Sequence, residues 1–119
     1  MRIGIIEDDE IIALALAAIL KERGASVVLN ARSYGEGLAA IQGGLPCDTY
    51  FVDLHLHGRP TGIDLAQRAV RAGYAVVVMT GGSSIPDALS GVGLLLKPFS
   101  RDQVADLVHR LSRPRSVAS

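Results

Sequence analysis

The chain has 119 residues, of which 49% are hydrophobic and only 4% aromatic. This length fits one compact domain, and the hydrophobic share suffices for a core without disulfide or metal staples. Because Trp is absent, Val, Ile, Leu and Ala must fill that core, as is typical of a parallel sheet covered by helices. Lys plus Arg and Asp plus Glu number 12 each, so no global charge directs the protein to nucleic acid or a membrane surface.

Cysteine usage and the distribution of apolar segments bear on where the protein works. Cys47 is the only cysteine, so an internal disulfide is impossible, in agreement with a reducing setting. The N-terminus lacks a basic region ahead of a long apolar stretch, and no segment approaches the length that spans a bilayer. We therefore expect a cytoplasmic protein without membrane insertion.

The first part of the chain alternates apolar runs with helical periodicity. Ile3 to Ile6 predicts a strand, and acids follow it at once. A helix that Gly24 ends comes next, predicted by apolar residues at helical spacing: Ile11, Leu14, Ala15, Ala18 and Ile19. Val27 to Leu29 predicts the second strand. Ser33 and Glu36 then have the spacing of a capping box and open a second helix, which glycines weaken.

The same alternation continues to the end of the chain. Tyr50 to Val52, Ala75 to Met79 and Leu94 to Leu96 predict three more strands, the second of them buried on both faces. A helix between the first two is predicted by Ile63, Leu65, Ala66, Ala69 and Val70. The last helix, capped by Ser100, is predicted to bury Val104, Leu107, Val108 and Leu111. Strands that alternate with helices indicate an α/β fold with a parallel sheet and right-handed crossovers.

Polar side chains follow the strands at the edge where such folds bind ligands, beyond the carboxyl ends. They are Glu7 and Asp8 after the first strand, Asp53 after the third, Thr80 after the fourth and Lys97 after the fifth. An uncompensated acidic cluster would raise its own pKa values, whereas Mg²⁺ takes oxygen ligands and usually keeps waters and a substrate phosphate. A carboxylate can also attack phosphorus to form an aspartyl phosphate. Lys97, Thr80 and N–H groups near Gly81 could then stabilise the phosphoryl oxygens.

This ordered set resembles the receiver domain of bacterial response regulators over essentially the full length of the chain. The shared pattern is the acidic pair, Asp53, Thr80 and the run Lys97-Pro98-Phe99. The resemblance implies a flavodoxin-like, doubly wound sheet of five parallel strands in the order 2-1-3-4-5, with helices on both faces. It also implies a phosphoacceptor that catalyses only its own phosphorylation and dephosphorylation with Mg²⁺, and so is not an enzyme acting on other substrates.

The resemblance assigns a role to each matching position. Asp53 resembles the phosphoacceptor, Asp8 the main metal-binding carboxylate and Glu7 its partner, which acts mainly through water. The backbone carbonyl of His55 resembles a third metal ligand. Thr80 resembles the hydroxyl that follows the phosphoryl group, with the Gly81 N–H beside it, and Lys97 the cation that pairs with Asp53 or its phosphate. In this family the Lys97–Pro98 peptide is typically cis.

The implied partners are proteins. A histidine kinase or a histidine phosphotransfer protein would supply the phosphoryl group, and a downstream protein target would read it, without direct contact to nucleic acid. Residues 1–119 are expected to form a single receiver domain, in which residues 112–119 are a short tail and no output domain follows.

Two departures from the family pattern affect signal transmission. Thr80 and Lys97 are only 17 positions apart, and the residues between them are poor helix formers: Gly81, Gly82, Ser83, Ser84, Pro86, Ser90, Gly91 and Gly93. We therefore expect the helix between the fourth and fifth strands to be short or irregular, as in an atypical, often stand-alone subclass. Leu94 also stands where the family usually has an aromatic switch residue. We hypothesise that ordering of the segment from Gly81 to Gly91 around the phosphate replaces the aromatic switch.

Simpler interpretations and other functions stand beside these. Asp9 and Glu10 are expected to act as helix caps, and His55 and His57 lack the further ligands of a closed zinc site. One alternative function is a pseudo-receiver, an interaction module that never takes phosphate. Another is a flavodoxin-like nucleotide-binding protein, although such proteins usually hold phosphate on a Gly/Ser-rich turn after the first strand, where this chain is acidic.

Overall fold

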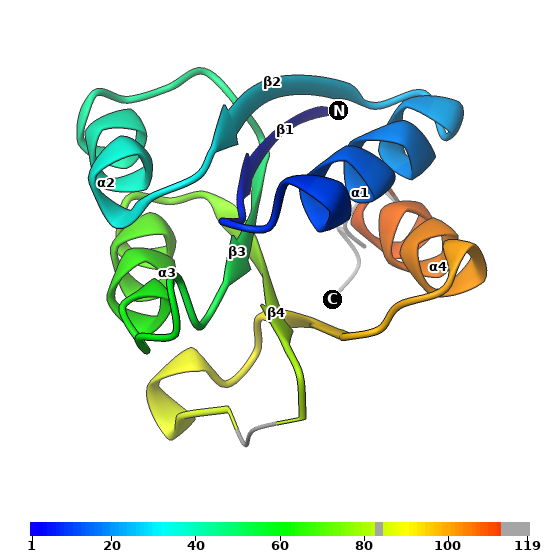
Figure 1. Cartoon of the computed structure of the whole chain (residues 1–119). Helices are drawn as coiled ribbons and strands as arrows, with labels where there is room; N and C mark the ends of the chain where they lie inside the picture. Colours follow the sequence, from blue (N-terminus) through cyan, green and yellow to red (C-terminus); the bar gives the residue numbers. More distant parts are fainter. Residues whose placement is uncertain (83–84, 113–119) are drawn as a thin grey trace.

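The computed structural model describes residues 1–82 and 85–112, which form a five-stranded parallel sheet between two layers of helices (Figure 1). The sheet order is β2-β1-β3-β4-β5, and every neighbouring pair is parallel. The strands are β1 (Arg2–Ile6), β2 (Ser26–Ala31), β3 (Thr49–Asp53), β4 (Ala75–Thr80) and β5 (Gly93–Leu96). The predicted fold class and strand order are confirmed.

Two pairs of helices cover the two faces of the sheet. The helices are α1 (Glu10–Glu22), α2 (Tyr34–Gln42), α3 (Gly62–Arg71) and α4 (Arg101–Ser112), with a short 3₁₀ helix, η1 (Asp87–Leu89). In Figure 1, α1 and α4 lie together on one face, and α2 and α3 lie together on the other. The face beneath α1 and α4 buries alternate residues of the strands, such as Ile5, Phe51 and Leu95, and the opposite face buries Ile6, Val52 and Val78.

The predicted helix starts are confirmed by their capping contacts. The Asp9 carboxylate accepts hydrogen bonds from the Ile11 and Ile12 N–H groups at 2.9 and 3.1 Å, and so begins α1. The Glu36 N–H donates to the Ser33 hydroxyl at the start of α2. Ser100 begins α4 with a reciprocal pair, in which its hydroxyl accepts from the Gln103 N–H and its own N–H donates to the Gln103 side chain.

In α1 the buried face differs from the apolar set that predicted the helix. Of that set only Ile19 is buried, whereas Ile11 and Leu14 are 79% and 58% exposed. The inner face consists of Ala13, Leu16, Ala17, Ile19 and Leu20. Because α1 is apolar on nearly every side, its periodicity identified a helix but could not show which side packs on the sheet.

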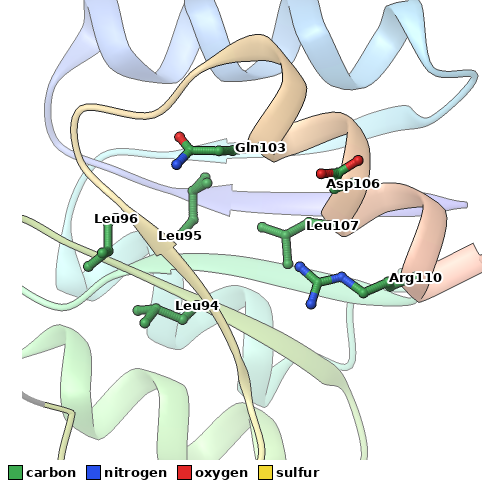
Figure 2. Close-up of a pocket in the computed structure, with 7 residues that line it drawn as sticks. All are labelled: Leu94, Leu95, Leu96, Gln103, Asp106, Leu107 and Arg110. Carbon is green, nitrogen blue, oxygen red and sulfur yellow. The ribbon is translucent and has the colours of Figure 1, made fainter.

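Between β4 and β5 the described residues contain only one short helix. It is the three-residue η1, whose Leu89 is buried against the α3 side of the sheet. The prediction of a short or irregular helix here is confirmed for these residues, while Ser83 and Ser84 lie outside the described part of the chain. On β5, Leu95 is buried and Leu94 and Leu96 are 40% and 48% exposed, so the two exposed side chains point away from Leu95 (Figure 2).

None of the helices in residues 1–82 and 85–112 combines the length and apolar character needed to cross a membrane. The predicted tail, residues 112–119, begins at the last residue of α4, and its residues 113–119 lie outside the described part of the chain.

Candidate functional site

The carboxyl ends of β1, β3 and β4 place three polar residues in nearly complete burial. Glu7 is 0% exposed, Asp53 4% and Thr80 1%. Buried carboxylates are costly unless a cation or hydrogen bonds compensate them. All three residues lie at the edge of the sheet that the sequence predicted, and the two carboxylates need compensating groups there.

Lys97 supplies the compensating positive charge inside the site. Its Nζ atom lies 2.6 Å from Glu7 Oε2 and 3.1 Å from Asp53 Oδ2, and the side chain is only 18% exposed. The Lys97 N–H donates to the Thr80 carbonyl at 2.8 Å, and the Lys97–Pro98 peptide is cis, as predicted. One lysine thus contacts two acids, one that follows β1 and one that ends β3.

The pKa values of Glu7 and Lys97 reflect both their burial and their contact with each other. Burial raises the pKa of Glu7 from 4.5 to about 7, although the hydrogen bond from Lys97 acts against that rise. Partial burial alone would lower the pKa of Lys97, but its hydrogen bonds to Glu7 and Asp53 raise it above the ordinary value. Lys97 therefore stays charged at neutral pH, and the raised pKa of Glu7 allows this carboxyl group to hold a proton there.

Asp8 lies at the open side of the same cluster. Carboxylate oxygens of Glu7, Asp8 and Asp53 all lie within 4.8 Å of one another. The Asp8 side chain is 24% exposed, and its Oδ2 accepts a hydrogen bond of 3.1 Å from the His57 N–H. Partial burial pushes the pKa of Asp8 upward, but the His57 N–H and its other neighbours outweigh this, so the pKa lies below its ordinary value. Asp8 is therefore the ionised carboxylate of the cluster that faces solvent.

The position of Asp53 is fixed by the turn that follows β3. Asp53 Oδ1 accepts a hydrogen bond of 2.9 Å from the His55 N–H, which leaves Oδ2 facing Lys97. The start of α3 presses on the same turn, because a Cβ atom at Gly62 would lie 1.8 Å from the Asp53 carbonyl oxygen. Only glycine allows this approach. Packing from α3 and hydrogen bonding from the turn together aim the Asp53 carboxylate at the site.

Thr80 ends β4 with a hydroxyl that has no hydrogen-bond partner among the described residues. A buried hydroxyl normally finds a partner, since leaving it unpaired costs about 1–3 kcal/mol. The unpaired Thr80 Oγ1 is thus a donor available within the site.

The structure brings together Glu7, Asp8, Asp53 and Lys97 as the sequence predicted, and the hydrogen bond from the Lys97 N–H to the Thr80 carbonyl places Thr80 beside them. The roles of the His55 carbonyl and the Gly81 N–H stay predictions, and Leu94 lies on β5 as a half-exposed aliphatic residue. Sequence reasoning considered His57 only as a zinc ligand and missed its contact with Asp8, and it also missed the need for glycine at position 62. The His-Gly pair at positions 57 and 58 was the available signal of a turn that requires a left-handed backbone.

The donor set of the site fits a hard divalent cation. Glu7, Asp8 and Asp53 offer only oxygen atoms, one of them on a partly exposed carboxylate that leaves room for water. Mg²⁺ prefers oxygen ligands and keeps several of its waters. These three residues can therefore hold Mg²⁺, with Asp53 also free to react.

Known proteins share the fold of this chain. The chain belongs to the response regulator receiver domain family, whose pattern matches residues 3–109. Receiver domains are signalling modules of two-component systems. The chain is 31% identical to the transcriptional regulatory protein DltR of Streptococcus agalactiae, and the match covers 98% of this chain and 54% of DltR. The chain thus spans about half the length of the curated relatives it matches.

Solved structures show the same architecture. A CheY-like receiver domain protein from Methanospirillum hungatei is 27% identical, with a TM-score of 0.76 and 92% of both chains covered. The response regulator PhyR from Brucella abortus is 25% identical, with a TM-score of 0.79 over 92% of this chain and 46% of PhyR. The receiver fold therefore extends over nearly the whole chain.

Proposed function

We propose that the chain is a cytoplasmic phosphoacceptor that takes a phosphoryl group onto Asp53 in a Mg²⁺-dependent reaction and signals through protein contacts. The observation that carries this proposal is the geometry around Asp53. Its Oδ2 lies 3.1 Å from Lys97 Nζ, and carboxylate oxygens of Asp53, Glu7 and Asp8 lie within 4.8 Å of one another. A buried carboxylate that faces a cation and a potential metal site is placed to attack phosphorus.

In the proposed reaction, a carboxylate oxygen of Asp53 forms a bond to the phosphorus of the donor. The bond from phosphorus to the donor nitrogen or oxygen breaks, and the donor keeps that electron pair. Mg²⁺, when bound, neutralises charge on the phosphoryl oxygens. Lys97 is placed to stabilise one of these oxygens, and the unpaired Thr80 hydroxyl can donate to another. Hydrolysis reverses the state, because water attacks phosphorus and the Asp53 carboxylate leaves.

The phosphodonor is proposed to be a histidine kinase or histidine phosphotransfer protein that docks beside Lys97. A hollow of about 380 Å³ adjoins this residue and is lined by Ile11, Ile12, Ala15, Lys97, Pro98 and Phe99. Ile11 is 79% exposed, so it presents an apolar surface next to the reacting groups. Ile11→Glu should slow transfer from a protein donor while uptake from acetyl phosphate stays unchanged; equal rates from the protein donor in both variants would exclude this surface.

Transmission of the phosphoryl signal is proposed to run through the segment between β4 and β5, because Leu94 lacks the ring and hydroxyl of an aromatic switch. The segment begins at Thr80, whose unpaired hydroxyl would bind the phosphoryl group, and continues to Leu89, which packs against the sheet. Hydrogen exchange at the amides of Gly82 and Leu89 should slow after phosphorylation. Unchanged exchange at both would refute this route.

The test of phosphorylation is an intact-mass measurement after incubation with Mg²⁺ and acetyl phosphate. Wild-type protein should gain one phosphoryl group, and neither Asp53→Asn nor wild-type protein in EDTA should gain any. A pseudo-receiver would show no addition and no Mg²⁺ binding. No addition by the wild-type protein despite Mg²⁺ binding would move the test to a protein donor.

A further inference from the structure

We propose that His57 is a positioning residue that orients Asp8 for metal binding by joining three loops over the site. This inference deepens the proposed function and rests on it. The first loop follows β1 and carries Asp8, the second follows β2 and carries Arg32, and the third follows β3 and carries His57. We call the contacts among these three residues the His57 clasp.

The backbone of His57 is held in a conformation that aims its N–H at Asp8. His57 has φ of +53° and Gly58 has φ of +73°, and the Arg59 N–H donates to the Leu56 carbonyl at 3.0 Å. Two consecutive positive φ values within such a hydrogen bond are the signature of a type I′ turn. His57 is the only non-glycine residue with positive φ in the described part of the chain. Its N–H points to Asp8 Oδ2 at 3.1 Å.

The imidazole ring anchors this turn to a second loop. His57 Nε2 lies 3.2 Å from the Arg32 carbonyl oxygen. Because a carbonyl only accepts, Nε2 carries the hydrogen. The Nδ1 atom is 3.8 Å from Asp8 Oδ2, which is too long for a hydrogen bond, so the ring acts on Asp8 through the turn and not by direct donation. The ring contact therefore fixes the turn whose N–H fixes Asp8.

Arg32 in turn connects to the start of α1. Its guanidinium lies 2.9 Å from Glu10 Oε1, two residues after Asp8. Both side chains are more than half exposed, so this pair contributes little energy by itself. It closes a ring of contacts, from Asp8 to His57 to Arg32 to Glu10, around the solvent-facing side of the site. Asp8 is the most exposed of the three clustered carboxylates, and an outer contact of this kind can restrict its orientation.

Two substitutions of His57 separate the ring contact from the turn. Asn places its amide near the position of Nδ1 and cannot reach Arg32 as Nε2 does, whereas Gln places its amide near Nε2 and can. Turn preference runs the other way, because Asn-Gly is strongly favoured in type I′ turns and Gln rarely adopts positive φ. If the ring contact to Arg32 orients Asp8, H57Q should retain Mg²⁺ affinity better than H57N. If the backbone preference of the turn alone matters, H57N should retain it better.

The test measures Mg²⁺ affinity by isothermal titration calorimetry and unfolding in EDTA by urea for wild type, H57N and H57Q, with H109N as a matched control on exposed α4 surface. We expect H57N to bind Mg²⁺ about 10-fold more weakly, H57Q to lie within about 3-fold of wild type, and H109N to be unchanged, because outer-shell changes typically cost 10–100-fold in metal affinity. In EDTA, H57N should be at least as stable as H57Q.

Each contrary result has a distinct meaning. Equal Mg²⁺ affinity in all variants, or higher affinity in H57N than in H57Q, would overturn the clasp and leave the phosphoacceptor function in place. Absence of Mg²⁺ binding in the wild-type protein would overturn the metal role of the clasp together with the proposed reaction. An affinity loss in H57N that matches a loss of stability in EDTA would reduce His57 to a structural residue.

Discussion

The carboxyl edge of the sheet around Asp53, here called the reaction edge, buries polar side chains, whereas the β4–β5 side of the molecule exposes apolar ones. At the reaction edge Glu7, Asp53 and Thr80 are no more than 4% exposed, whereas on β5 Leu94 and Leu96 are at least 40% exposed. Proteins generally bury leucine and expose acidic and hydroxyl-bearing residues. The buried polar edge therefore leaves little room for substitution, whereas the exposed side chains of β5 leave more.

The largest effect is expected from a change that disturbs the reaction edge by a single methyl group. Gly62→Ala would place Cβ against the backbone of Asp53, at 1.8 Å from its carbonyl oxygen, where no flexible side chain can move aside. We expect the free energy of unfolding to fall by about 3 kcal/mol or more, with loss of phosphorylation, because overpacking of this kind displaces backbone. Urea unfolding monitored by circular dichroism measures the change.

Gly35→Ala is the matched control for that variant. Gly35 lies in α2, and a Cβ there would meet nothing within 4 Å. Because Ala is favoured over Gly in helices, this variant should gain about 0.5–1 kcal/mol. If Gly62→Ala is as stable as wild type, the close approach of α3 does not hold Asp53 in place.

A pH dependence of intermediate size is expected from Glu7. Its pKa is about 7 in the folded protein without metal, against 4.5 for an ordinary glutamate, because burial disfavours the charged form. Between these values the folded state holds a proton that the unfolded chain releases. The free energy of unfolding contributed by Glu7 should therefore be fully present below about pH 4.5 and be lost as pH rises through about 7.

The comparison of wild type with Glu7→Gln isolates this contribution from other titrating groups. Urea unfolding in EDTA at about pH 5.5 and about pH 8 should show a larger fall for wild type than for Glu7→Gln. The two proteins should differ less in saturating Mg²⁺, because the metal favours the ionised carboxylate. Identical pH slopes for both proteins in EDTA would show that Glu7 does not carry a raised pKa.

The smallest effect is expected from a substitution on the exposed surface of β5. Leu94→Tyr should change the free energy of unfolding by no more than about 0.5 kcal/mol, since the Leu94 side chain is 40% exposed on β5. Uptake of phosphate from acetyl phosphate should also be unchanged, because the polar groups that hold the Asp53 carboxylate are the His55 N–H and Lys97 Nζ, which Leu94→Tyr leaves in place. A marked change in the uptake rate would mean that the two regions are coupled more closely than their burial suggests.

The sequence predicts the fold and much of the site because both depend on local patterns. Apolar runs identified every strand, and Asp9, Ser33 and Ser100 identified three helix starts through side chains that act on their own backbone. Asp53 and Lys97 could be paired because parallel strands bring their carboxyl ends to one edge.

Features that depend on packing between distant elements could not be predicted in this way. The buried side of α1 is decided by contact with the sheet, since Ile11 and Leu16 are equally apolar in the sequence and only Leu16 is buried. The requirement for glycine at position 62 exists only once α3 is placed against β3. The link between His57 and Arg32 joins two loops that are 25 residues apart, and no local pattern records it.

The place of β5 at the border of the sheet has a consequence for self-association. A border strand presents unpaired backbone groups, and exposed leucines beside them favour edge-to-edge aggregation. Here β5 has only four residues, Gly93–Leu96, and Pro98 follows two residues later without an N–H to offer. The strand is thus too short, and too soon interrupted, to serve as a long template for another chain, so Leu94 and Leu96 can stay in solvent with little risk of fibrous assembly.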